Sequence, residues 1–182
     1  PADPVAGVEG ALGVAAGAAH ACAWAKDQVW CWGWNHRGQL GDGTAGYAIA
    51  PVKVDIAGAK QVATGLLHTC VSTQADVHCF GGNAYGQIGD GSWQIAAAPV
   101  KLALPMETVD LAASHLHTCA VLKDGTAACW GSNEAGALGN GQQWGNQLAA
   151  QSVFGLKGAT AVATGYNFTC YRLTGGTVQC TG

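Results

Sequence analysis

Eight cysteines recur at a nearly fixed interval along this chain, and this recurrence limits the possible folds more than any other feature. They form four pairs with members 9 or 10 residues apart, and the first members of successive pairs are 48, 49 and 51 residues apart. The pairs are Cys22 and Cys31, Cys70 and Cys79, Cys119 and Cys129, and Cys170 and Cys180. Such a period indicates structural repeats, each a small unit that must pack against its neighbours.

The residues around the cysteines keep the same period. The residue two positions before the first cysteine is a histidine in three copies and a phenylalanine in the fourth: His20, His68, His117 and Phe168. The unit is therefore about 49 residues long, with three full copies and a fourth that stops after its second cysteine. We treat residues 1–182 as one repeat domain, with approximate repeats 4–50, 51–98, 99–151 and a partial 152–182.

Glycine-rich turns separate short segments of strand length, and 28 of the 182 residues are glycine. A period of 40–50 residues with such turns is typical of β-propellers, in which each blade is a small antiparallel sheet. We therefore predict an all-β chain that forms propeller blades of four antiparallel strands. About three and a half repeats would leave the ring incomplete unless another chain completes it.

Each cysteine pair frames a predicted hairpin. If the two cysteines face each other, the 9-residue pairs leave two-residue loops at 26–27 and 74–75, although neither Gln74 nor Ala75 favours positive φ. The 10-residue pairs leave three-residue loops at 123–125 and 174–176, with glycine third, where a left-handed residue is required. Facing residues of a hairpin lie within disulfide range. The sequence thus predicts one disulfide per hairpin, and hence an oxidising compartment: secreted, cell-surface or periplasmic.

Metal ligation is an alternative for a His-x-Cys segment followed by a second cysteine. The spacing matches no common zinc motif, and Phe168 replaces the histidine in the fourth copy. Free buried thiols are a further alternative. We expect no metal and no cofactor.

The other recurring side chains have structural interpretations. The three histidines are predicted to hold each blade together through a hydrogen bond from imidazole to the backbone. The aromatic residue after each second cysteine is predicted to pack between blades, and the recurring asparagine and aspartate positions to form turns. These positions are Trp32, Phe80 and Trp130, then Asn35, Asn83 and Asn133, and then Asp42, Asp90 and Asn140.

Charge and hydropathy exclude two classes of function. The chain has eight basic and eleven acidic residues, and the basic residues are scattered, which argues against a nucleic-acid binder. No apolar run approaches the length of a membrane-spanning helix. The N-terminus lacks the features of a signal peptide, so we expect that the signal of an exported protein has already been removed.

The span from Ser114 to Gly139 reads Ser-x-x-His-Thr-Cys-Ala-Val-Leu-x-Asp-Gly-Thr-x-x-Cys-Trp-Gly-x-Asn-x-x-Gly-x-Leu-Gly. It resembles the regulator of chromosome condensation repeat, as do the spans that begin at Gly17 and Gly65, and the cysteine pair resembles an exported bacterial variant. The resemblance implies a β-propeller, commonly seven-bladed, in a family that includes a secreted β-lactamase inhibitor and a nuclear exchange factor that binds chromatin. Paired cysteines and the absence of a basic segment do not fit the nuclear role.

An open stack of blades leaves apolar faces and strand edges in water, which is an aggregation hazard. Either the chain is a fragment of a longer protein or copies of it complete one another. Two chains could close a ring of seven or eight blades, or head-to-tail contacts could build a filament. The low charge fits a chain that buries much of its surface in such contacts.

Side chains that vary between repeats at turns are the candidates for partner binding, because they can change without harming a blade. Aromatic residues and arginine are enriched at interface hot spots, although these rings could instead pack on their own loops. The candidates are Trp34, His36, Arg37, Tyr47, Tyr85, Trp93 and Trp144.

Two classes of function remain. The first is an extracellular, non-enzymatic protein-interaction or assembly module whose partners are proteins, above all copies of itself, as in a surface or filament subunit. Its alternative form is a secreted propeller that inhibits or binds another extracellular protein, such as a hydrolase. The second class is an enzyme. No Ser/His/Asp order, paired carboxylates or phosphate loop stands out, so we expect no catalytic residues.

Overall fold

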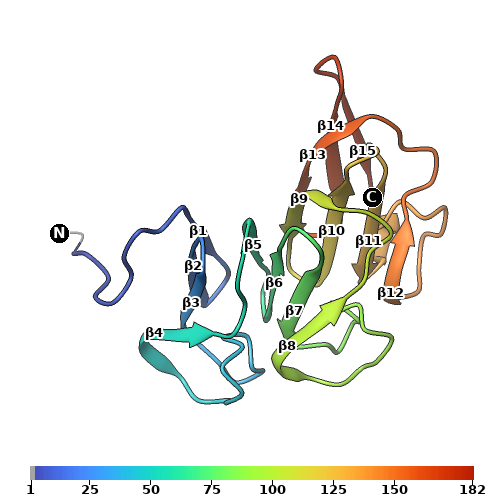
Figure 1. Ribbon diagram of the computed structural model, residues 1–182. Coiled ribbons are helices and arrows are strands. Elements are labelled where there is room, and N and C mark those ends of the chain that lie inside the picture. The colour runs from blue at the N-terminus through green and yellow to red at the C-terminus, as the bar shows by residue number, and fades with distance from the viewer. Residues whose placement is uncertain (1–2) are drawn as a thin grey trace.

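The computed structural model describes residues 3–182, which form four small antiparallel sheets side by side in an open arc (Figure 1). Blade 1 contains β1 (Gly13–Ala16), β2 (His20–Ala25), β3 (Gln28–Gly33) and β4 (Ala48–Val54), and blade 2 contains β5 (Gln61–Thr64), β6 (His68–Ser72), β7 (Val77–Gly81) and β8 (Ala96–Leu102). Blade 3 contains β9 (Thr108–Ala113), β10 (His117–Leu122), β11 (Ala127–Gly131) and β12 (Gln147–Ser152), and blade 4 contains β13 (Ala159–Thr164), β14 (Thr169–Leu173) and β15 (Val178–Thr181). The predicted all-β propeller is confirmed, with four antiparallel strands in each of blades 1–3 and three in the partial blade 4, and the arc does not close.

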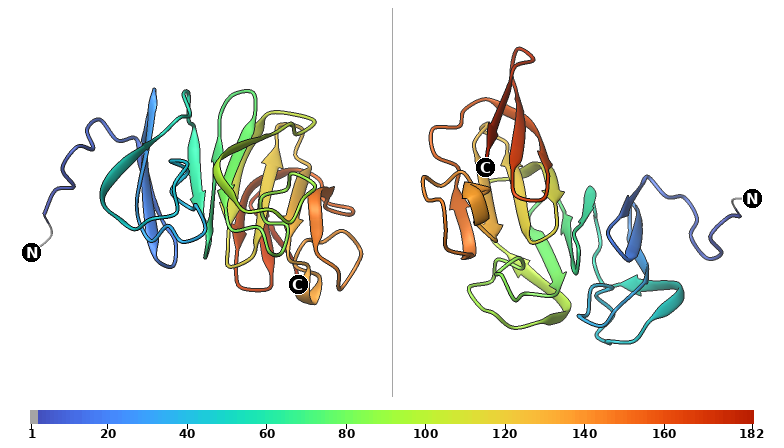
Figure 2. Two further views of the ribbon diagram at one scale, coloured as in Figure 1. Left: turned by 90° about the horizontal axis from the view of Figure 1, so that it is seen from below. Right: turned by 180° about the vertical axis from the view of Figure 1, so that it is seen from behind.

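The strands follow chain order within every sheet. The first strands β1, β5, β9 and β13 contact one another along the chain of blades, whereas β4, β8 and β12 are edge strands at the other side of their sheets. The views in Figure 2 show the sheets next to one another in chain order around the arc. One 3₁₀ turn, η1 (Glu134–Gly136), is the only helical element among residues 3–182. None of the helices in the described part of the chain could cross a membrane.

The hairpins have the register that the cysteine spacing predicts. Each pair of cysteines faces across the second and third strands of its blade and forms a disulfide: Cys22–Cys31, Cys70–Cys79, Cys119–Cys129 and Cys170–Cys180. The loops at 123–125 and 174–176 end on glycines with φ of 80° and 87°.

The two-residue loop at Gln74-Ala75 works without positive φ at either residue. Thr73 closes it instead: its Oγ1 accepts hydrogen bonds from the backbone N–H groups of Ala75 and Asp76. The same hydroxyl donates to the Asp76 carbonyl at 3.1 Å. A threonine before the turn therefore replaces the conformational freedom that glycine provides in the longer loops.

The hydrophobic core lies between blades. Three clusters of buried side chains each combine residues of two consecutive blades. Phe80 packs with Leu40 of blade 1, Trp130 packs with Ile88 of blade 2, and Tyr171 packs with Leu138 of blade 3. As predicted, Phe80 and Trp130 are inter-blade core residues; a blade therefore buries its apolar side chains mainly against its neighbours.

Candidate interaction surface

Each interface between blades contains the same short chain of hydrogen bonds, which we call the His–Thr relay. The histidine at the start of one blade's second strand contacts a threonine hydroxyl of the next blade. The three pairs are His20 with Thr69 at 2.8 Å, His68 with Thr118 at 2.9 Å, and His117 with Thr169 at 2.9 Å. The predicted bond to the backbone is therefore wrong, because the imidazole joins two blades instead of holding one together.

The relay also assigns the histidine tautomer. Thr69 donates its own hydroxyl hydrogen to the Gln39 carbonyl at 2.9 Å, so His20 must donate through Nε2. The Nδ1 atoms of His20 and His68 are buried without a partner, and only an unprotonated nitrogen suits that site. Burial accordingly lowers the pKa of His20 and His117 to about 4 and that of His68 to about 3, where neighbouring His20 and His117 add to the effect.

Blade 3 contains a serine–histidine pair that the sequence analysis did not single out. The Ser114 Oγ lies 2.9 Å from the His117 Nδ1, and Thr169 occupies the other ring nitrogen. With Nε2 donating to Thr169, Ser114 is the donor to Nδ1. No carboxylate orients the ring, and a histidine with a pKa of about 4 is a weak base at neutral pH. The pair thus satisfies a buried polar atom that blades 1 and 2 leave unpaired.

The long loops after β3, β7 and β11 are organised by one asparagine each. The Asn35 side chain accepts from the Leu40 N–H at 2.9 Å and donates to Asp42 at 3.2 Å. The equivalents in blades 2 and 3 repeat this pattern, so the predicted turn-forming role is confirmed at Asn35, Asn83 and Asn133. These asparagines are fully buried, which makes the loops rigid parts of the scaffold.

The same loops cross from their own blade to the next. Gly43 donates its N–H to the Ala97 carbonyl of blade 2, and Gly91 donates to the Leu148 carbonyl of blade 3. Each loop begins beside the turn between its blade's first two strands, as the bond from the Gly82 N–H to the Leu67 carbonyl shows. The turns and the long loops therefore lie together at the same end of the strands in successive blades, and we call this side of the arc the loop face.

A groove of about 380 Å³ opens on the loop face. Three successive blades supply its walls, and most of the lining surface is apolar. The lining residues are Arg37, Leu67, Gly82, Asn83, Ala84, Tyr85, Gln87, Trp93, Ile95 and Leu116. Tyr85, Trp93 and Ile95 are 41%, 51% and 48% exposed. The structure thus brings three of the predicted binding residues, Arg37, Tyr85 and Trp93, to one groove.

The other predicted binding residues lie elsewhere. Trp34 and His36 form an edge-to-face pair with ring centroids 5.2 Å apart on the loop of blade 1. Tyr47 and Trp144 are exposed on separate loops and do not line the groove. Leu67 and Leu116 line the groove but were not predicted; each directly precedes a repeat histidine, where blades 1 and 4 have Ala19 and Asn167.

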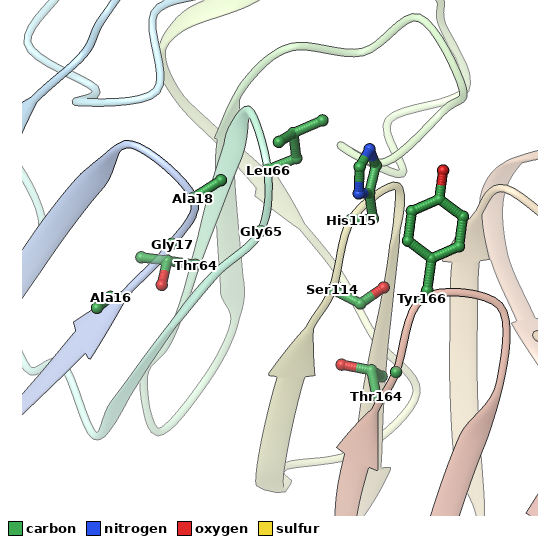
Figure 3. A pocket seen from close by; sticks show the side chains of 11 residues that line it. Ala16, Gly17, Ala18, Thr64, Gly65, Leu66, Ser114, His115, Thr164 and Tyr166 are labelled. Atoms are coloured by element: carbon green, nitrogen blue, oxygen red, sulfur yellow. The ribbon is translucent and has the colours of Figure 1, made fainter.

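A second hollow of about 370 Å³ lies where the first strands of the four blades meet (Figure 3). Equivalent turns of all four blades line it, and the rings of His115 and Tyr166 contact each other in a tilted arrangement with centroids 4.5 Å apart. The two hollows adjoin, because Leu66 lines one and Leu67 the other. No group of three or more His, Cys, Asp or Glu side chains within residues 3–182 is placed to hold a metal ion.

Comparisons with known proteins agree with this architecture. Two models described as Regulator of chromosome condensation (RCC1) repeat match residues 26–72 and 109–137. No curated protein matches the sequence.

Several solved propellers are similar in fold. Human WBSCR16 has a TM-score of 0.82 at 21% identity, over 96% of this chain and 48% of its own. Yeast RCC1 (Prp20), bound to Kap60, has a TM-score of 0.76 at 22% identity, over 87% and 41%. The ectodomain of the receptor kinase CR4 from Physcomitrella patens has a TM-score of 0.61 at 19% identity, over 94% and 41%. The chain thus spans less than half the length of each of these structures.

Proposed function

The chain belongs to the regulator of chromosome condensation (RCC1) repeat family of β-propellers, and we propose that it is an extracellular, non-enzymatic module that binds a partner protein through its loop face. The groove between blades 1 and 3 carries this proposal. Half-exposed aromatic side chains beside an arginine, held on loops with buried asparagine anchors, have the composition of an interface hot spot. The yeast propeller of similar fold was solved bound to the protein Kap60.

The groove also suggests the chemistry of the partner. Arg37 forms none of the three ion pairs among residues 3–182, so its guanidinium is available for a carboxylate. Leu67, Leu116 and Ile95 offer an apolar floor beside it. We therefore expect a partner segment with an acidic residue next to a large apolar side chain. A loop of a secreted hydrolase is one such segment, and binding would then inhibit that enzyme.

Selection of peptides from a displayed random library against the immobilised protein tests this proposal. Selected peptides should carry the acidic–apolar pattern, and Trp93→Ala should weaken their binding at least about tenfold, the loss of one hot-spot contact. Trp144→Ala is the matched control, because Trp144 is exposed outside the groove and its loss should leave binding unchanged. Equal binding by both variants would contradict the proposal.

Export and the absence of catalysis are parts of the same proposal. Four disulfides within hairpins support an oxidising compartment. Alkylation of the natural protein in denaturant without prior reduction should modify no cysteine, whereas free buried thiols would react. A serine-directed fluorophosphonate should leave Ser114 unlabelled, because the weakly basic His117 does not activate it.

A second candidate function, assembly with copies of itself, is favoured by the two outward faces of the arc. These are the faces of blade 1 and blade 4 that point away from the other blades. Val14 on blade 1 is 74% exposed, whereas Val62 and Leu111, its equivalents on blades 2 and 3, are 4% and 2% exposed. Val178 on blade 4 is 65% exposed. Sedimentation velocity over a wide concentration range should show concentration-dependent association; a single monomeric species throughout would contradict this candidate.

A further inference from the structure

The two outward faces of the arc differ from every internal interface at one pair of positions. Within the arc, each relay pairs a histidine of one blade with a threonine of the next. On blade 1, the threonine position holds Ala21, and on blade 4 the histidine position holds Phe168. Both halves of the relay are therefore replaced by apolar residues, and only at the two outward faces.

The two replacements belong to opposite halves of the same contact. The threonine side of a blade faces the preceding blade, and the histidine side faces the following one. Ala21 thus lies on the outward face of blade 1 and Phe168 on the outward face of blade 4, where it is 51% exposed. If these two faces met, Phe168 would stand opposite Ala21, as His68 stands opposite Thr118 inside the arc.

The chemistry of these two replacements favours burial of the two outward faces against each other. A buried histidine or threonine that loses its partner is strongly destabilising, whereas replacing both partners with apolar groups is nearly neutral. The two replacements also compensate in volume: Ala21 is smaller than the threonine of the other blades, and the side chain of Phe168 on the other face is larger and apolar. Either replacement alone, against an unchanged partner, would leave an unpaired polar atom.

The surroundings of both residues are suited to contact. On blade 4, Ala161, Ala163 and Val178 line an apolar hollow of about 200 Å³ beside the partly exposed disulfide that ends at Cys180. Arg172 is the one charged residue that lines this hollow, and its guanidinium is held to Thr160 at 3.1 Å.

Blade 1 offers apolar side chains on the corresponding face. These are Val14 and the partly exposed Trp32. Trp32 faces Ala21 across the hairpin, and Val14 faces Ala23, two residues further along the same strand.

We propose that the outward face of blade 4 in one copy of the chain packs on the outward face of blade 1 in a second copy, with Phe168 against Ala21. This inference rests on the self-assembly candidate above and adds its polarity and its central contact. Because the two surfaces are different, the contact is head-to-tail, which either closes a ring or continues as a filament.

Two single variants and their mixture test the polarity. Phe168→Asp disables only the blade 4 face and Ala21→Asp only the blade 1 face, so sedimentation should show that each variant alone is monomeric. An equimolar mixture should form a one-to-one complex through the two intact faces and grow no further. A symmetric contact between identical faces would instead persist in one of the single variants, and this result would overturn the proposal.

A compensating pair tests the contact itself. Phe168→His and Ala21→Thr should each raise the dissociation constant about tenfold, the equivalent of one unpaired polar group, and the double variant should recover association by recreating the relay. Phe154→Asp is the control, because Phe154 is 82% exposed and outside both faces. Thermal melting checks that all variants fold.

The failure of this inference is distinguishable from the failure of self-assembly. If the unaltered chain stays monomeric, both are overturned. If it associates but all Ala21 and Phe168 variants associate equally well, self-assembly stands and the Phe168–Ala21 contact is overturned.

Discussion

The interface between blades 2 and 3 and the outward face of blade 4 are built from the same repeat positions but have different environments. The Cys70–Cys79 disulfide is fully buried against blade 3, whereas its equivalent on blade 4 reaches the surface. His68 is buried inside the arc, and Phe168 at the same position is 51% exposed. The comparison teaches that the hairpin and its disulfide are local structures, whereas burial of the blade surface depends on the neighbour.

The largest expected difference concerns pH, because only the internal interfaces bury histidines. The pKa of His68 falls from 6.5 to about 3 on folding, so the unfolded chain binds protons more readily than the folded one. This contribution to the free energy of unfolding is complete above pH 6.5 and is lost as the pH falls towards 3. Protonation of each of the three relay histidines should lower the free energy of unfolding by on the order of 3 kcal/mol over that range.

Urea unfolding between pH 7.5 and 5 measures this loss above the range in which Glu107 titrates, since its pKa is lowered to about 2 by Lys60 and Lys123. His117→Phe, which copies blade 4, should make the pH dependence less steep while Thr169 keeps its bond to the Ala137 carbonyl. An unchanged slope in this variant would show that the relay does not bury a neutral histidine.

The second expected difference concerns the aromatic residue after the second cysteine. Trp130 is fully buried against blade 2 and donates its indole N–H to the Gln87 carbonyl at 2.9 Å, whereas Trp32 at the same position of blade 1 is partly exposed. Trp130→Ala should lower the free energy of unfolding by about 3–5 kcal/mol. Trp32→Ala should cost about 1–2 kcal/mol in the monomer. Equal losses in urea unfolding would mean that neighbouring blades contribute little.

The third expected difference separates loop closure from burial. The Cys119–Cys129 and Cys170–Cys180 disulfides both span 10 residues, so the chain-entropy model assigns each the same contribution, about 2.7 kcal/mol. Replacing the buried pair by alanines should cost more, because it also leaves a cavity between blades 3 and 4. Denaturant unfolding of the two double variants measures the difference, and a larger loss at Cys170 and Cys180 would contradict this account.

The smallest expected difference comes from a single hydroxyl. Thr118→Val removes the acceptor of His68 inside the arc and should cost about 1–3 kcal/mol, the penalty of a buried unpaired donor. Ala21→Thr adds the equivalent hydroxyl on the outward face of blade 1, where water can bind it, and should change the stability of the monomer by less than about 0.5 kcal/mol. Chemical unfolding at low protein concentration compares the two.

Sequence reasoning was accurate where an interaction is short-range. The cysteine spacings predicted the hairpin register, and the glycines at 125 and 176 predicted the three-residue loops. It was wrong about the histidine partner, because the hydroxyl that bonds His20 lies 49 residues away on another blade. The groove was only partly predicted for the same reason. Arg37 and Trp93 were singled out, but Leu67 and Leu116 come together in one groove only when three blades lie side by side.

The repeating sequence by itself determined the size of the blade, its antiparallel hairpins and the positions of its disulfides, because turn chemistry and cross-strand pairing act over a few residues. Only the tertiary structure decided which copy of each repeated residue is buried, which threonine each histidine contacts and which loop residues share a groove. Those outcomes depend on which side chains of the next blade lie opposite. A residue has the same neighbours in sequence whether or not the next blade covers it.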